Sequence, residues 1–75
     1  MKDKILNFIS KASKHQIDDL SNNLNAEGLW DSLTHVELIV MLEEEFDIFF
    51  DENEIALMRT PAKVIELTQQ KVEYK

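Results

Sequence analysis

Hydrophobic residues along the chain repeat at helical spacing in several separate stretches. In the first stretch they recur every three or four positions: Ile5, Leu6, Phe8, Ile9 and Ala12. Such spacing places apolar side chains on one face of a helix, so we predict a first helix from about Lys2 to Lys14. Residues 15–31 lack this period, and the segment "SNNLN" with Gly28 is typical of a loop. We therefore predict a long loop, anchored by its apolar residues: Ile17, Leu20, Leu24 and Leu29.

A second helix is predicted from about Ser32 to Glu45 or Phe46, and it has two apolar faces. The face predicted to pack on the core carries five residues: His35, Leu38, Ile39, Leu42 and Phe46. Nearly opposite lie Leu33, Val36 and Val40, among the acidic residues Glu37, Glu44 and Asp47. This second stripe fits a docking surface for a partner, and it equally fits a helix that the bundle wraps more completely.

The remainder of the chain predicts two more helices. "DENEIALM" suits a short helix, and "RTPAKVIELTQQKV" suits a last one with Thr60 as N-cap and Pro61 at its first position. The chain has one glycine and one proline, and it shows no internal repeat or linker. We predict an all-α domain over residues 1–75, a small four-helix bundle with a long loop after the first helix and a short third helix.

Composition and charge narrow the possible functions. There is no cysteine, and no apolar run reaches the roughly 20 residues of a membrane span, so we expect a soluble cytoplasmic protein without membrane insertion. The net charge is −7, and no lysine or arginine occurs between Lys14 and Arg59. This acidic middle works against binding nucleic acid and predicts partners with basic patches.

Ser32 is the candidate for chemistry, because it follows Asp31 at a predicted helix start. Unpaired amides and the helix dipole favour a phosphate at such a position, although Asp-Ser pairs commonly do no more than cap a helix. A nucleophilic role would need a base, and the two histidines are His15 and His35. The helical spacing does not aim His35 at the serine, and no Gly-x-Ser-x-Gly motif is present, so we predict no catalytic residue.

The acidic segments do not predict a metal site. "DIFFDENEIALM" has Phe49 at the third position of a calcium loop and no glycine at the sixth, and "EEEFD" is interpreted as a solvated acidic face. Phe49 and Phe50 are interpreted as anchors of the core or loop, as are Met41 and Met58. Trp30 could pack the loop on the bundle or lie exposed beside Ser32, and the sequence leaves both open.

Taken together, these motifs resemble the acyl carrier protein family over essentially the whole chain. The resemblance rests on Asp31-Ser32-Leu33, on Val36-Glu37-Leu38 followed by "LEEEFDI", and on the helix start at Thr60-Pro61. It implies that Ser32 receives 4′-phosphopantetheine from coenzyme A through a separate magnesium-dependent phosphopantetheinyl transferase. The arm would then carry acyl or aminoacyl groups as thioesters between biosynthetic enzymes, and the protein itself would not be an enzyme.

The same resemblance implies roles for further residues. Asp31 would help to position the serine, and partner enzymes would read five residues of the second helix: Leu33, Val36, Glu37, Val40 and Glu44. We expect a monomer that binds acyl- or aminoacyl-loading and acyl-transferring enzymes with basic patches. Trp30 and Thr34-His35 differ from the usual fatty-acid carriers and are closer to stand-alone carriers of polyketide, nonribosomal-peptide and D-alanyl pathways. The alternative is an acidic helical adaptor that binds a basic partner without covalent modification.

Overall fold

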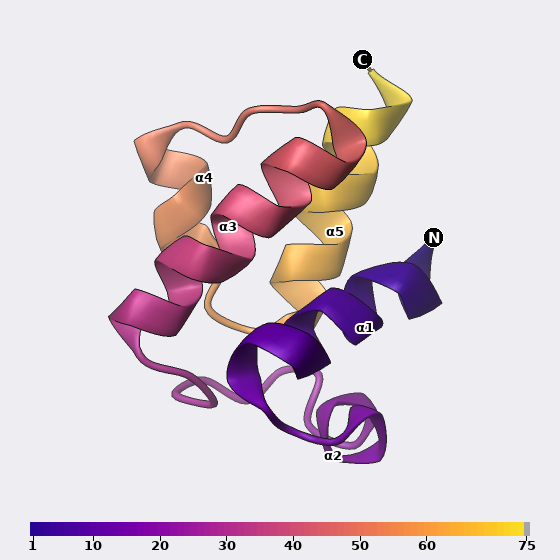
Figure 1. The fold of residues 1–75 in the computed structure, drawn as a ribbon, viewed down its shortest axis with the longest axis vertical. Coiled ribbons are helices and arrows are strands. Elements are labelled where there is room, and N and C mark those ends of the chain that lie inside the picture. Colours follow the sequence, from indigo (N-terminus) through magenta and orange to yellow (C-terminus); the bar gives the residue numbers. More distant parts are fainter. Residues whose placement is uncertain (75) are drawn as a thin grey trace.

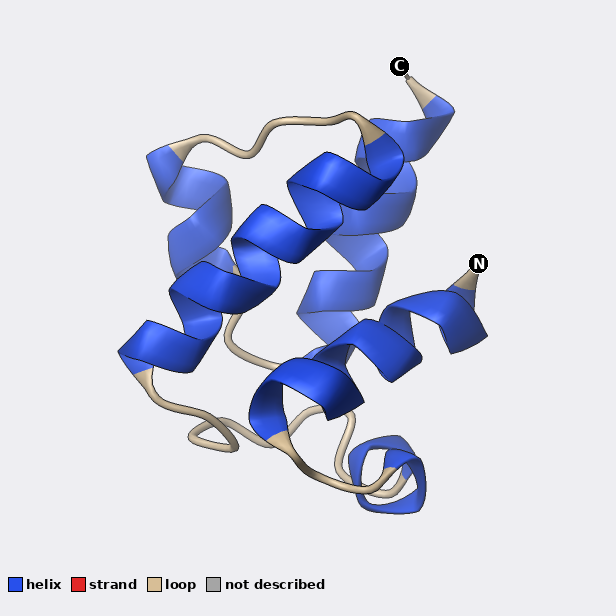
Figure 2. Cartoon of the chain, in the orientation of Figure 1, coloured by secondary structure: helices blue, strands red, loops and turns tan. Residues whose placement is uncertain are grey.

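The computed structural model describes residues 1–74 and contains five helices in that range (Figures 1 and 2). Their bounds are α1 Lys2–Ser13, α2 Ile17–Ser21, α3 Ser32–Phe46, α4 Glu52–Leu57 and α5 Pro61–Glu73. The predicted small helical bundle is confirmed, with its short helix before the last one. The predicted long loop differs in one respect, because it contains the short helix α2.

Helix α2 escaped the pattern analysis because five residues are too few to show a helical period. Its one buried residue is Leu20, which is completely inaccessible. Ile17 was also predicted to anchor this segment, and that prediction is wrong, since its side chain is 39% exposed. The loop after α2 is joined to the bundle by the backbone, where the Ala62 amide donates to the Leu24 carbonyl at 2.8 Å.

Helix α1 is the central element of the bundle, in contact with α2, α3 and α5. In Figure 1, α1 and α3 lie on the near side, α5 lies behind them, and α4 stands at the left. The molecule measures 30 × 23 × 18 Å. The buried apolar core draws on α1, α2, α3 and α5 and on the segments before and after α4, with Phe46 of α3 and Ile55 of α4 packed at its edge. Its residues are Ile5, Leu6, Ile9, Leu20, Leu38, Ile39, Leu42, Ile48, Phe50, Met58, Val64 and Ile65.

The two faces of α3 separate as the sequence predicted. Leu38, Ile39 and Leu42 are buried, whereas Leu33, Val36 and Val40 are 70%, 58% and 44% exposed. The structure therefore favours the exposed stripe over the alternative in which the bundle wraps this helix. Among residues 1–74, none of the helices has the length and apolar character needed to cross a membrane.

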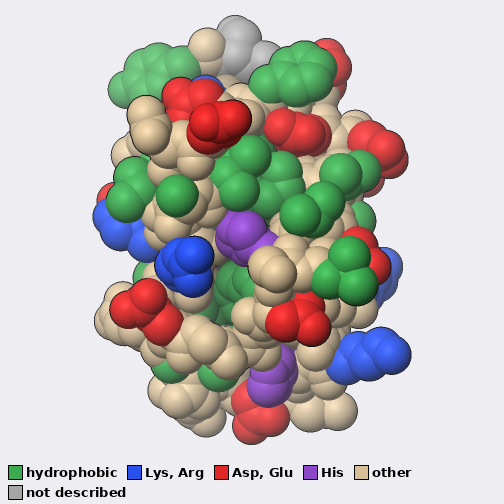
Figure 3. All heavy atoms as spheres, turned by 90° about the vertical axis from the view of Figure 1, so that its left-hand side faces the viewer, with side chains coloured by type: hydrophobic (Ala, Val, Ile, Leu, Met, Phe, Trp, Pro, Cys, Tyr) green, Lys and Arg blue, Asp and Glu red, His purple; other side chains and the backbone are tan. Residues whose placement is uncertain are grey.

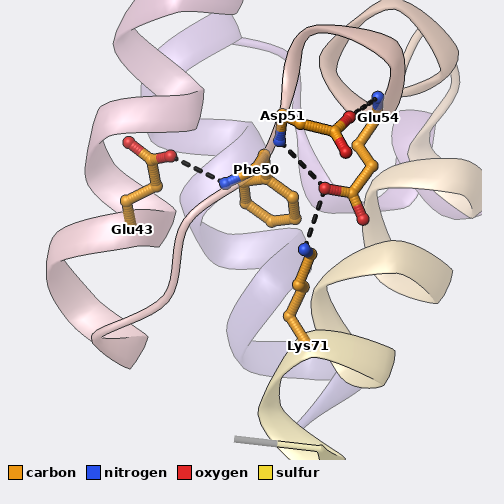
Figure 4. A network of polar contacts seen from close by, with 5 residues as sticks. All are labelled: Glu43, Phe50, Asp51, Glu54 and Lys71. Atoms are coloured by element: carbon orange, nitrogen blue, oxygen red, sulfur yellow. Dashed lines mark hydrogen bonds and ion pairs between the residues drawn. The ribbon is translucent and has the colours of Figure 1, made fainter.

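The connection from α3 to α4 is fixed by carboxylates (Figure 4). Glu43 accepts a hydrogen bond from the Phe50 amide at 2.9 Å. The prediction that the segment "EEEFD" is a solvated acidic face is therefore wrong for Glu43. Phe50 is buried as predicted, but Phe49 is 80% exposed, so the prediction that it anchors the core is wrong. Adjacent residues of an extended segment point to opposite sides, and only one of the two phenyl rings can therefore enter the core.

Helix α5 begins with the predicted cap, and α4 begins with a capping box that was not predicted. Asp51 and Glu54 form a capping box at α4, and Glu54 also pairs with Lys71 of α5 at 2.9 Å (Figure 4). At α5 the Thr60 hydroxyl accepts from the Lys63 amide at 3.1 Å, and Pro61 occupies the first turn. Arg59 is the middle one of the three residues between these helices, and it lies near the start of α3, where the candidate site is found.

Candidate functional site

Ser32 is the first residue of α3, and the preceding residue caps that helix. The Asp31 carboxylate accepts from the Thr34 amide at 2.8 Å, and the Asp31 carbonyl accepts from the His35 amide at 2.9 Å. The hydrogen bond from the Thr34 amide holds the pKa of Asp31 below its usual value. A charged cap therefore orients the first turn and presents Ser32 on the surface.

The Ser32 hydroxyl makes no hydrogen bond to any residue that the structure describes. His35 is engaged elsewhere through both of its ring nitrogens. Its Nδ1 accepts from the Trp30 indole Nε1 at 2.9 Å, and its Nε2 lies 2.9 Å from the Ile55 carbonyl. Since an indole N–H can only donate and a carbonyl can only accept, the proton of a neutral His35 sits on Nε2. His35 thus has no free nitrogen to act as a base toward Ser32.

The same contacts resolve the two alternatives for Trp30. Its indole is partly buried and stacks on the His35 ring, with centroids 6.3 Å apart and planes 14° from parallel. Because His35 also bonds to Ile55, one imidazole joins the loop before Ser32 to both α3 and α4. Trp30 packs the loop on the bundle while standing beside the serine.

A second histidine supports the loop from the other side. His15 Nε2 donates to the Leu29 carbonyl at 2.6 Å, and the His15 carbonyl accepts from the Ser10 hydroxyl at 2.6 Å. Between these anchors, Gly28 turns the chain with a φ of +77°, a conformation that suits glycine. Two imidazole rings therefore hold the adjacent residues Leu29 and Trp30, just before Ser32.

A hollow of about 110 Å³ opens beside the serine. Its lining residues come from the loop, the first turn of α3 and the α4–α5 connection: Gly28, Trp30, Asp31, Ser32, His35 and Arg59. The sequence analysis did not place Arg59 at the site. The sequence shows that Arg59 ends a long stretch without lysine or arginine, but this does not place it beside Ser32.

The five residues predicted to be read by partner enzymes share the surface of α3. Leu33, Glu37 and Glu44 are exposed together with Val36 and Val40. Figure 3 views the side on which α4 and the start of α3 lie, and hydrophobic side chains gather there with carboxylates among them. Phe49 and Leu57 are also exposed, at 80% and 59%, and they were not among the residues predicted for the partner surface. Within residues 1–74, no three His, Asp or Glu side chains are grouped to hold a metal ion.

Comparison with known proteins agrees with this architecture. The chain is 30% identical to the D-alanyl carrier protein of Abiotrophia defectiva over 76 residues, and the match covers 96% of each chain. No protein-family model matches the sequence. The chain belongs to the acyl carrier protein family. The match also supports the predicted closeness to stand-alone, dedicated carriers, and carrier proteins are generally not enzymes themselves.

Proposed function

We propose that this protein is an aminoacyl or acyl carrier that is modified on Ser32 with 4′-phosphopantetheine. The observation that carries the proposal is the exposed Ser32 hydroxyl, which makes no hydrogen bond to the described residues and stands at the first position of α3. A phosphodiester at that oxygen would meet the positive end of a 15-residue helix and the hollow beside it. The residues present therefore fit the group.

The chain supplies the acceptor oxygen, and a transferase would supply the catalysis. The serine oxygen would form the new bond to the diphosphate phosphorus of coenzyme A that carries the pantetheine group. The bond from this phosphorus to the bridging oxygen would break, and adenosine 3′,5′-bisphosphate would leave. The serine proton would pass to a base of the transferase, since His35 is engaged and the Asp31 carboxylate caps Thr34. Once attached, the arm brings the thiol that this cysteine-free chain lacks, and that thiol can carry cargo as a thioester.

For the cargo we favour an aminoacyl group. The support for this choice is the matched relative, which is named for D-alanyl cargo. Loading and transferring enzymes would dock on the exposed residues of α3, with basic groups facing its carboxylates and apolar groups facing Leu33, Val36 and Val40.

The test is intact-mass measurement after incubation with coenzyme A, magnesium and a broad-specificity phosphopantetheinyl transferase. We expect one phosphopantetheine addition to the wild type and none to Ser32→Ala. Ser21→Ala is the matched control, because Ser21 is also an exposed helical serine, and it should be modified like the wild type. Addition to Ser32→Ala would refute the assignment. A folded wild type that takes up nothing would favour the acidic adaptor, whose partner binding should survive Ser32→Ala.

A further inference from the structure

Arg59 is one of the cations of this protein that have no acidic partner among residues 1–74. Lys4 pairs with Glu45 at 2.8 Å, Lys63 with Glu66 at 2.8 Å, and Lys71 with Glu54 at 2.9 Å. Arg59 forms no ion pair with any residue in the range 1–74, although acidic residues outnumber basic ones by 15 to 8. Lys2, Lys11 and Lys14 form no ion pair either, but they do not line the hollow beside Ser32, whereas Arg59 does.

The position of Arg59 is equally specific. It lies between α4 and α5, and it lines the same hollow as Ser32, 27 positions earlier in the chain. The acidic residue in that hollow, Asp31, directs its carboxylate to the Thr34 amide. The hollow therefore combines a serine hydroxyl with a guanidinium group that the described residues leave unneutralised.

A guanidinium group is well suited to a phosphate. Its planar set of N–H donors matches two phosphate oxygens at once, and these charge-assisted hydrogen bonds are stronger than neutral ones. A phosphodiester on Ser32 carries one negative charge at the mouth of the hollow. The Asp31 carboxylate lines the same hollow and would repel that charge, and the Arg59 guanidinium group would offset this repulsion.

We propose that Arg59 binds the phosphate of the phosphopantetheine arm and draws the first part of the arm into the hollow against Trp30. This inference rests on the proposed function, because it concerns the group attached to Ser32. It adds that the arm has a resting position on the carrier. A partner enzyme that offers a carboxylate to Arg59, or a cation to the phosphate, would then release the arm.

The experiment compares unmodified and modified protein, with complete modification verified by mass. In the wild type, modification should shift the Arg59 Nε–H resonance in proton–nitrogen NMR spectra. It should also raise Tm by about 2–4 °C, the scale of an exposed charge-assisted contact in a domain of this size. Arg59→Gln should lose that gain and move the phosphorus-31 resonance of the arm. High salt should move the wild-type phosphorus signal in the same direction.

Two variants serve as controls. Lys63→Gln removes an exposed cation from α5, outside the residues that line the hollow, and should keep the wild-type shift and Tm gain. Arg59→Lys keeps the charge without the planar donors, and it should retain part of the wild-type phosphorus shift and part of the Tm gain. An Arg59 resonance unmoved by complete modification, with equal Tm gains in wild type and Arg59→Gln, would overturn the inference while leaving the proposed function intact. Failure of the wild type to become modified would overturn both.

Discussion

The two ends of α3 are built from different kinds of contact. At the Phe46 end, carboxylates have fixed partners within the protein. Glu43 accepts from the Phe50 amide, and Glu54 both completes a capping box and pairs with Lys71. At the Ser32 end, aromatic and imidazole rings hold the loop, through the bonds of Trp30 and Ile55 to His35.

The difference between the ends lies in what each leaves available. Around the Phe46 end, the side chains of Glu43, Glu54 and Lys71 are committed to one another or to the backbone. Around the Ser32 end, the serine hydroxyl has no hydrogen bond and Arg59 has no ion pair among residues 1–74. Interactions of charged side chains thus stabilise the Phe46 end of α3. At the Ser32 end, the ring contacts fix the loop, and the Ser32 hydroxyl and the Arg59 guanidinium group are left able to bind a ligand.

The largest effect should come from His35→Phe, which keeps a flat ring against Trp30 but removes both hydrogen bonds. The Trp30 N–H and the Ile55 carbonyl then lose their partner, so we expect the free energy of unfolding to fall by about 2 kcal/mol. Because the loop before Ser32 is loosened, modification by the transferase should also slow. Urea unfolding followed by circular dichroism, with a timed mass assay, measures the two effects.

The control for His35→Phe is a double-mutant cycle with Trp30→Phe. If the two rings act as one unit, the double variant should lose less than the sum of the single variants. Strict additivity, or a loss below about 0.5 kcal/mol for His35→Phe, would show that the imidazole does not hold this end of the helix.

A smaller effect is expected from Glu54→Ala at the other end. It removes the reciprocal cap of α4 and the half-exposed ion pair with Lys71, for a loss of about 1.5 kcal/mol. Glu54→Gln is the matched control, because an amide can still accept from the Asp51 amide, so it should lose only about 0.5 kcal/mol. Neither variant should change the rate of Ser32 modification. A slowed modification would mean that the two ends are coupled through α4.

Most of the fold could be predicted from local patterns. Periodic apolar residues located α1 and the buried side of α3, and Thr60-Pro61 located the start of α5, because each signal depends on the geometry of one helix. The exposed stripe of α3 was predicted as one of two alternatives, since a helical wheel does not say how far neighbouring helices extend. Phe49 and Phe50 show the same limit, because two adjacent identical residues carry no sign of which one is buried.

The candidate site was predictable only in part. Ser32 and Asp31 are adjacent in the chain, so a helix start and a family motif were enough to select them. Arg59 was missed because it reaches the site through the packing of α4 and α5, which no local pattern encodes. His35 was assigned to the core side correctly, but its bond to Trp30 depends on the path of an irregular loop, and sequence spacing does not define that path.

The smallest expected effect concerns the cap of α3 and its dependence on pH. Asp31→Ala removes the acceptor for the Thr34 amide and should lower Tm by about 4 °C at neutral pH, whereas Asp31→Asn keeps an acceptor and should lose less. Because the pKa of Asp31 is lowered in the folded protein, its charge stabilises the fold above the unfolded pKa, near 3.9. That contribution is lost as pH falls through the lower folded pKa. The Tm values of wild type and Asp31→Asn should therefore converge as the pH falls below the unfolded pKa and through the lower folded pKa. If the difference in Tm between wild type and Asp31→Asn stayed constant over that pH range, the Asp31 side chain would stabilise the Ser32 end as a hydrogen-bond acceptor and not through its charge.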